Sequence, residues 1–185
     1  MSNGYPIFSP ATGRYTKSMR TGMGNLFDGH DATGDSANEP VQIHEKKESL
    51  LTAHCDGGSR GNPGPAGFGA VVEDENGVVL ARLNGFLGIC TNNVAEYSGL
   101  LAVLRWALQE GHSRLKVVAD SELMVKQMKG IYKVKSPDLK PLWEEAKLLT
   151  KKLKDFRIEH TLRGGNKEAD RLANEAMDRG MGKRQ

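Results

Sequence analysis

The chain has 185 residues, of which 38% are hydrophobic and 26% charged, and its formal net charge is +3. This length and composition fit a soluble protein with one domain, a substantial core and a tail. No apolar run approaches the roughly 18 residues of a membrane span, and no secretory signal is evident, so we expect a cytoplasmic protein without membrane contact.

The two cysteines, Cys55 and Cys90, form no CxxC pair and no Cys/His cluster. This pattern argues against a zinc site. The sequence alone leaves both a disulfide and two free thiols possible. In a reducing compartment, the better interpretation is that the two cysteines are small apolar residues.

Residues 1–48 are predicted to be a poorly ordered tail. They are rich in Gly, Ser, Thr, Asn, Asp and Pro, and their apolar residues follow neither a strand period nor a helix period. No pattern in this tail indicates a function. We predict a folded domain over 49–181, followed by a short tail at 182–185.

The folded domain is predicted to begin with strands. Leu50–Asp56 is a short strand, and Gly57–Gly67 is a Gly/Pro-rich turn. Phe68–Glu73 and Val78–Phe86 are β-rich runs on either side of Asp74–Gly77, whose Asn-Gly ending predicts a hairpin.

Helices and strands alternate in the second half. The expected elements are, in order, helix Thr91–Glu110, strand Leu115–Asp120, helix Glu122–Ile131, helix Asp138–Lys154 and strand Phe156–Leu162. Asn166 can cap a last helix. Hairpins first and helix-connected strands later predict an α/β fold with a mixed sheet and helices packed on it.

Two aspartates are predicted to lie at the carboxyl ends of strands. Asp56 follows Leu51–Cys55, and Asp120 follows Leu115–Ala119. If those strands are parallel neighbours, the two carboxylates face each other at the edge where α/β sheets usually bind ligands. Each aspartate alone is more often a turn or helix cap.

Glu96 and Asp170 are predicted to lie on helices. The helix around Glu96 is apolar nearly all round, so its carboxylate must be paired, protonated or metal-bound. Asp170 lies one turn into the last helix, beside an apolar face. A helix dipole offers an alternative explanation for each.

Taken together, the four carboxylates predict a metal site. Four such groups at one sheet edge would repel one another without a counter-ion. Mg²⁺ prefers oxygen ligands and keeps waters and phosphate oxygens in its shell. Two ions about 4 Å apart can catalyse an in-line phosphoryl displacement.

Lysines accumulate in the second half of the domain. Nine lie between Lys126 and Lys154, against only three acidic residues. On its own this stretch is best explained as the solvated surface of a helix. It becomes informative if a polyanion binds nearby.

Four segments resemble the signature blocks of type 1 ribonuclease H, in the order and spacing of that family. They are Cys55–Pro65, Thr91–Glu96, Ala119–Ser121 and Asn166–Asp170, and the resemblance covers about residues 50–180. It implies the ribonuclease H-like fold, with a five-stranded mixed sheet of order 3-2-1-4-5. It also implies hydrolysis of the RNA strand of RNA–DNA hybrids with two Mg²⁺ ions, for which Mn²⁺ may substitute, leaving 3′-hydroxyl and 5′-phosphate ends.

The resemblance also implies roles for individual residues. The metal ligands and catalytic acids are Asp56, Glu96, Asp120 and Asp170. The substrate contacts are Gly57, with Asn62 and Thr91 at a DNA-strand phosphate and Asn92 and Asn93 at minor-groove edges or the backbone. The alternatives are turn chemistry for the glycine segment and helix capping for Thr91 or Asn92.

Three departures from the family pattern stand out. In place of a mobile-loop histidine we assign Arg163 the auxiliary catalytic role, because His160 follows the apolar alternation of its strand and is expected to be packed. The basic protrusion of some relatives is reduced to Tyr132–Pro137, which predicts weaker and more salt-sensitive hybrid binding. Residues 1–48 do not resemble the hybrid-binding domain of some eukaryotic members.

The leading hypothesis is therefore an active endonuclease whose partner is an RNA–DNA hybrid. We expect a monomer without an obligate protein partner. One alternative is a hybrid-binding module that has lost catalysis, although all four acids are intact. Another is a different nuclease on the same fold, such as a junction resolvase or an RNA-strand exonuclease.

Overall fold

A computed structural model describes residues 49–182. The tail predicted for 1–48, and residues 183–185 of the C-terminal tail, lie outside the described residues. The predicted α/β fold is therefore tested on the segment that carries all four acids.

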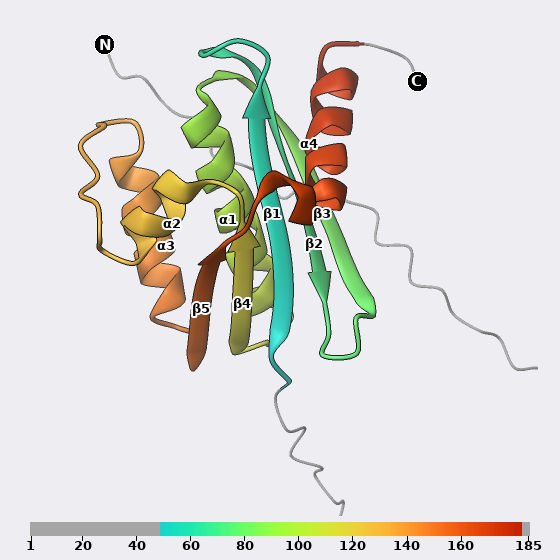
Figure 1. Ribbon diagram of the computed structural model, residues 1–185, viewed down its shortest axis with the longest axis vertical. Helices are drawn as coiled ribbons and strands as arrows, with labels where there is room; N and C mark the ends of the chain where they lie inside the picture. Colours follow the sequence, from blue (N-terminus) through green and yellow to red (C-terminus); the bar gives the residue numbers. More distant parts are fainter. Residues whose placement is uncertain (1–48, 183–185) are drawn as a thin grey trace, which may run out of the picture. The chain divides into compact units, whose positions relative to one another are not determined.

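The described residues form one mixed sheet of five strands in the order β3-β2-β1-β4-β5, as predicted (Figure 1). β1 pairs antiparallel with β2 and β2 with β3, whereas β4 is parallel to both β1 and β5. The strands are β1 (Leu51–Ser59), β2 (Gly64–Glu73), β3 (Val79–Cys90), β4 (Arg114–Ala119) and β5 (Asp155–His160).

Helices cover both faces of this sheet (Figure 1). The helices are α1 (Asn92–Gln109), α2 (Glu122–Met128), α3 (Lys140–Thr150) and α4 (Lys167–Gly180), with the short 3₁₀ turn η1 (Arg163–Gly165) before α4. α1 packs on β1 and β2 and contacts α3, and α4 packs on the opposite face, over β1, β2 and β3. Helices on both faces leave the carboxyl ends of β1 and β4 as an open edge.

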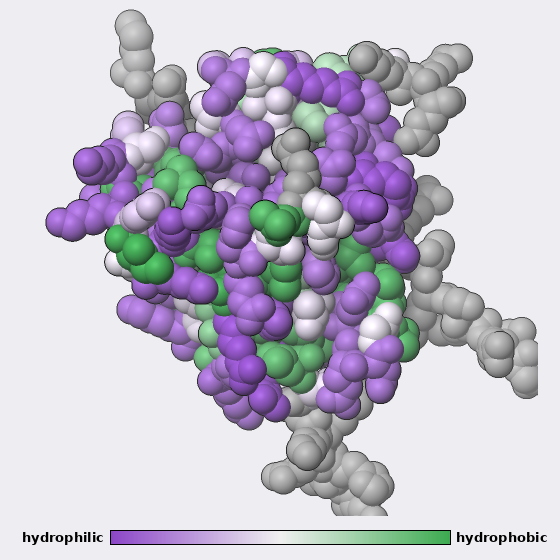
Figure 2. Space-filling view, in the orientation of Figure 1, coloured by the Kyte–Doolittle hydropathy of each residue, from purple (hydrophilic) through white to green (hydrophobic). Residues whose placement is uncertain are grey.

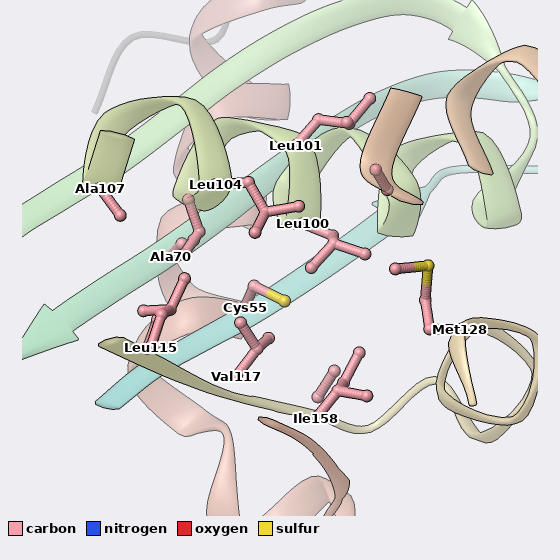
Figure 3. Close-up of a cluster of buried hydrophobic side chains, with 14 of the residues drawn as sticks. Cys55, Ala70, Leu100, Leu101, Leu104, Ala107, Leu115, Val117, Met128 and Ile158 are labelled. Atoms are coloured by element: carbon pink, nitrogen blue, oxygen red, sulfur yellow. The ribbon is translucent and has the colours of Figure 1, made fainter. Parts of the chain in front are cut away.

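The main core lies between the sheet and α1. Figure 3 shows Cys55 of β1 with Leu100 of α1 and Val117 of β4 on either side of it, and all three side chains are fully buried. Burial raises the pKa of the Cys55 thiol. Cys55 and Cys90 are both free thiols, which agrees with the apolar interpretation of the two cysteines.

The turn predicted for Gly57–Gly67 was wrong in extent. β1 runs on to Ser59 and β2 begins at Gly64, so only residues 60–63 turn. Gly57 and Gly58 pair with β2 and belong to the strand ladder. A Cβ on Gly57 would lie only 2.2 Å from the backbone of Ala95, so this glycine serves the close approach of α1.

The apolar stripe predicted for the third helix packs as expected, although the helix is shorter than Asp138–Lys154. Leu139, Ala146 and Leu153 are buried in the core. Leu142, Trp143 and Leu149 are partly buried against it. The lysines of this stretch are mostly at the surface, as a solvated helix face requires.

The face shown in Figure 2 is mainly hydrophilic, with hydrophobic residues in small separate groups. Among the exposed apolar side chains are Ile89, 70% exposed at the end of β3, and Leu162, 80% exposed after β5. Within residues 49–182 no helix is both long and apolar enough to span a membrane.

Candidate active site

Asp56 lies where β1 leaves the parallel ladder. The last β1–β4 pair joins Cys55 to Ala119, and Asp56 pairs only with Gly69 of β2. Its side chain is 8% exposed, and its Oδ1 accepts a hydrogen bond from the N–H of Gly57 at 2.8 Å. Asp56 therefore sits within the strand, at the end of the β1–β4 ladder instead of at the strand's own end.

Glu96 reaches the same place from α1. Thr91 caps this helix, with its Oγ1 accepting from the N–H of Val94 at 3.4 Å. A Cβ on Gly57 would lie 2.2 Å from the backbone nitrogen of Glu96, so the bare glycine lets the first turns of α1 rest directly on β1. The Glu96 side chain is buried, at 5% exposed.

Asp120 follows the last residue of β4. The next residue, Ser121, turns the chain into α2 and caps it, with its Oγ accepting from the N–H of Met124 at 3.4 Å. Because β1 and β4 are parallel neighbours, Asp120 emerges beside Asp56, as the sequence predicted. Asp120 is partly exposed, so this side of the cluster is open to solvent.

The structure brings three of the predicted acids together. Asp56, Glu96 and Asp120 each offer a carboxylate oxygen, and these oxygens lie within 4.8 Å of one another. We call these three residues the acidic triad. They fit a divalent metal ion, because oxygen ligands are what Mg²⁺ prefers and because the triad concentrates negative charge where little solvent screens it.

The electrostatics of Asp56 show how strong this concentration is. Burial, and then the negative charges of Asp120 and Asp170, raise the pKa of Asp56 to about 7. The N–H of Gly57 opposes the shift only in part. A cation at the triad would favour the ionised carboxylate, so proton and metal compete for this site.

Asp170 lies beside the triad and is not one of its three members. It is in the first turn of α4, half-buried, and its carboxyl group shares a hydrogen bond with that of Asp56. The fourth acid thus approaches from the face of the sheet opposite to α1. A hollow between β1 and α4 connects it to Arg60, Asn92, Asn174 and Met177.

Of the predicted substrate contacts, Gly57 and Asn92 line this hollow. The side chain of Asn62 accepts the N–H of Asn92 at 3.2 Å, and that of Asn92 accepts the N–H of Ser59 at 3.3 Å. These bonds tie the β1–β2 turn to the start of α1. Thr91 is the cap of α1, so the alternative of helix capping holds for it, and Asn93 is partly buried in the first turn.

Arg163 and His160 were the two residues considered for the auxiliary catalytic role. The Arg163 side chain lies outside what the structure describes, and its backbone is in η1. The expected packing of His160 was wrong: this residue is exposed at the end of β5. It lies close enough to Glu122 to help lower the pKa of that carboxyl group, after the larger effect of Lys126.

Asn166 is a site residue that the sequence assigned to a different task. It occupies the cap position of α4, but its side chain makes no capping hydrogen bond. Its Nδ2 donates instead to the carbonyl of Cys55 at 2.8 Å and to Oδ1 of Asp120 at 3.5 Å. The available signal was its place in the block that ends in Asp170, four residues ahead of that acid.

Comparison with known proteins agrees with this geometry. Residues 54–176 match the family described as reverse transcriptase-like. The chain is 40% identical over 145 residues to ribonuclease HI of Halobacterium salinarum, covering 78% of this chain and 73% of that protein. It is 50% identical over 129 residues to a bifunctional protein of Mycobacterium tuberculosis, covering 69% of this chain but 35% of that one, so it spans about a third of that relative.

Solved structures give the same picture. The N-terminal RNase H domain of the M. tuberculosis protein superposes with a TM-score of 0.70 at 46% identity, covering 72% of this chain and 97% of that one. LC11-RNase H1 from compost, in complex with an RNA/DNA hybrid, gives 0.68 at 39% identity, covering 71% and 99%.

The sheet order and the buried acidic cluster define a protein of the ribonuclease H-like class. With the identity and coverage shared with ribonuclease HI, the chain belongs to the ribonuclease H family.

Proposed function

We propose that this protein is an endoribonuclease that hydrolyses the RNA strand of RNA–DNA hybrids. The observation that carries the proposal is the largely buried acidic triad, with carboxylate oxygens within 4.8 Å of one another at the end of the β1–β4 ladder. Relatives named ribonuclease HI, and a similar structure determined with an RNA/DNA hybrid, support the substrate class.

Asp56, Glu96 and Asp120 would hold the metal, with Asp170 beside them as the fourth acid. When bound, a pair of Mg²⁺ ions (or Mn²⁺) supplies an activated water and stabilises the leaving oxygen, which leaves 3′-hydroxyl and 5′-phosphate ends. The chain's own task is to gather these carboxylates at one spot, where the bound cations would keep them ionised. Rigid elements do this, because β1, α1 and β4 each fix one acid.

The predicted substrate contacts Gly57, Asn62, Thr91, Asn92 and Asn93 would orient the hybrid over the acids. Gly57 and Asn92 line the hollow beside Asp56, and Asn62 is hydrogen-bonded to Asn92. The amide side chains among them suit both backbone phosphates and minor-groove base edges. Arg163 keeps its proposed auxiliary role in the segment that leads into α4. We further propose that residues 49–181 are the catalytic domain of a cytoplasmic, monomeric enzyme.

A cleavage assay on three matched duplexes tests the proposal. The full chain is incubated with an internally labelled RNA–DNA hybrid, the all-DNA duplex and the all-RNA duplex, with Mg²⁺, with Mn²⁺ and with EDTA. We expect metal-dependent cutting of the RNA strand of the hybrid alone, giving internal fragments. Hybrid that the protein retains on a filter but leaves intact with both metals would indicate a binding module. Products shortened from one end would indicate an exonuclease.

A further inference from the structure

The Asn166 side chain is almost completely enclosed, at 1% exposed, among the elements that carry the acids. Through its backbone it begins α4, because its carbonyl accepts the N–H of Asp170 at 3.0 Å. Through its side chain it binds the carbonyl of Cys55, the residue before Asp56, and contacts Asp120. Asn166 is thus bonded to the backbone next to Asp56, to the carboxylate of Asp120 and to the backbone N–H of Asp170.

The chemistry of its neighbours fixes which way this amide faces. The Cys55 carbonyl and an ionised Asp120 carboxylate both only accept hydrogen bonds. The NH₂ end of Asn166 must therefore point towards them, and the distances of 2.8 and 3.5 Å rank the bond to Cys55 as the stronger one. The contact with Asp120 is at the upper limit of a hydrogen-bond distance. It can therefore orient that carboxylate and still leave its oxygens available to a metal ion.

Space filling alone does not explain an asparagine at this position. Its Oδ1 is buried and accepts no hydrogen bond from any of the described residues. A buried acceptor left in this state lowers stability, whereas a leucine of similar volume would fill the space without that cost. Helix capping does not explain it either, since the side chain makes no capping bond.

We propose that Asn166 is a positioning residue for the metal site: its NH₂ group locks the start of α4 to β1 next to Asp56 and orients Asp120. This inference rests on the proposed function, because it assumes that the acids hold metal. Loss of a residue that hydrogen-bonds to a metal ligand or to its neighbouring backbone commonly lowers metal affinity or activity by about 10–100-fold. We expect a loss of about this size when Asn166 is replaced.

The test compares two variants of Asn166 with a structural control, all in the full chain. Asn166→Leu keeps the volume, removes the buried unsatisfied oxygen and removes the donor, and Asn166→Ala removes both volume and donor. Leu172→Ala is the control, because Leu172 is buried on α4, at 4% exposed, and its apolar side chain packs the same helix without offering a hydrogen-bond donor to an acid. Mn²⁺ affinity is measured by calorimetry without nucleic acid, alongside thermal unfolding and the kcat and KM of hybrid cleavage.

We expect Asn166→Leu to unfold near the wild-type temperature, because removal of the unsatisfied Oδ1 offsets the hydrogen bond that the Cys55 carbonyl loses. The variant should bind Mn²⁺ about 10–100-fold more weakly, with a lower kcat and an unchanged KM. Leu172→Ala should lower the unfolding temperature and leave Mn²⁺ affinity unchanged. Wild-type Mn²⁺ affinity in Asn166→Leu, or in Asn166→Ala if the leucine variant does not fold, would overturn the proposal. The proposal would also be overturned if both Asn166 variants lost Mn²⁺ affinity only in proportion to their loss of stability, with Leu172→Ala as the reference for that proportion.

Failure of the proposed function is distinguishable from failure of this inference. A wild-type protein that binds Mn²⁺ but cuts no hybrid would defeat the nuclease proposal. The calorimetric comparison of wild type and Asn166→Leu would still decide whether Asn166 supports the metal site.

Discussion

Replacing Gly57 by alanine should separate the acids while adding a single methyl group. The new Cβ would lie 2.2 Å from the backbone of Ala95 and Glu96, against 3.4 Å for ordinary contact, so α1 must move from β1 by about 1.2 Å. Overpacking of this kind costs about 1–3 kcal/mol of unfolding free energy. Because Glu96 moves with α1, the triad opens, and a misplacement of about 1 Å can cost about 10²-fold in rate.

The neighbouring glycine provides the control. A Cβ on Gly58 would meet the Met177 side chain at 3.6 Å, which is ordinary contact. Urea denaturation and Mn²⁺ calorimetry of both alanine variants should therefore show losses of stability and of metal affinity for Gly57→Ala only. Equal stability and equal affinity in the two variants would refute the idea that the close approach of α1 to β1 sets the position of Glu96.

Two further predictions concern charge and packing. Because burial and neighbouring acids raise the pKa of Asp56 from 3.8 to about 7, the metal-free fold holds a proton there that the unfolded chain releases at lower pH. The contribution of this group to stability is thus complete below about pH 4 and is lost as pH rises through about 7, by at most about 4 kcal/mol. Urea denaturation in EDTA across this range should show the decline, Asp56→Asn should flatten it, and an unchanged slope in that variant would contradict the assignment. Leu100→Ala removes a fully buried side chain of α1 and should lower the unfolding free energy by about 2–5 kcal/mol. Urea denaturation measures this loss. A loss below about 1 kcal/mol would contradict a rigidly packed core, because it would mean that neighbouring side chains fill the cavity.

The sheet order and the meeting of Asp56 with Asp120 could be predicted because both follow from local patterns. Alternating strands, an Asn-Gly hairpin and helix-linked strands leave few topologies, and parallel neighbours bring their carboxyl ends together. The four acids were identified by their place in the family's blocks, together with the cost of burying Glu96 in an apolar helix.

The errors arose where a distant element decides the role of a residue. Gly57 and Gly58 looked like turn residues, but they continue β1, and Gly57 is small because α1 lies against it. Asn166 looked like a helix cap, but the carbonyl of Cys55, 111 positions away, takes its donor. His160 continues the alternation of β5, yet the strand ends there, beside the start of α2 and beyond the core.

The most direct measurement is the Mg²⁺-dependent cleavage of one labelled RNA–DNA hybrid by the wild type and by Asp120→Asn, side by side. Asp120 completes the triad, so the variant should lose nearly all cleavage while unfolding no earlier than the wild type, since it removes a repelling charge. Cleavage of the hybrid by Asp120→Asn at the wild-type rate would contradict a metal site built from these carboxylates.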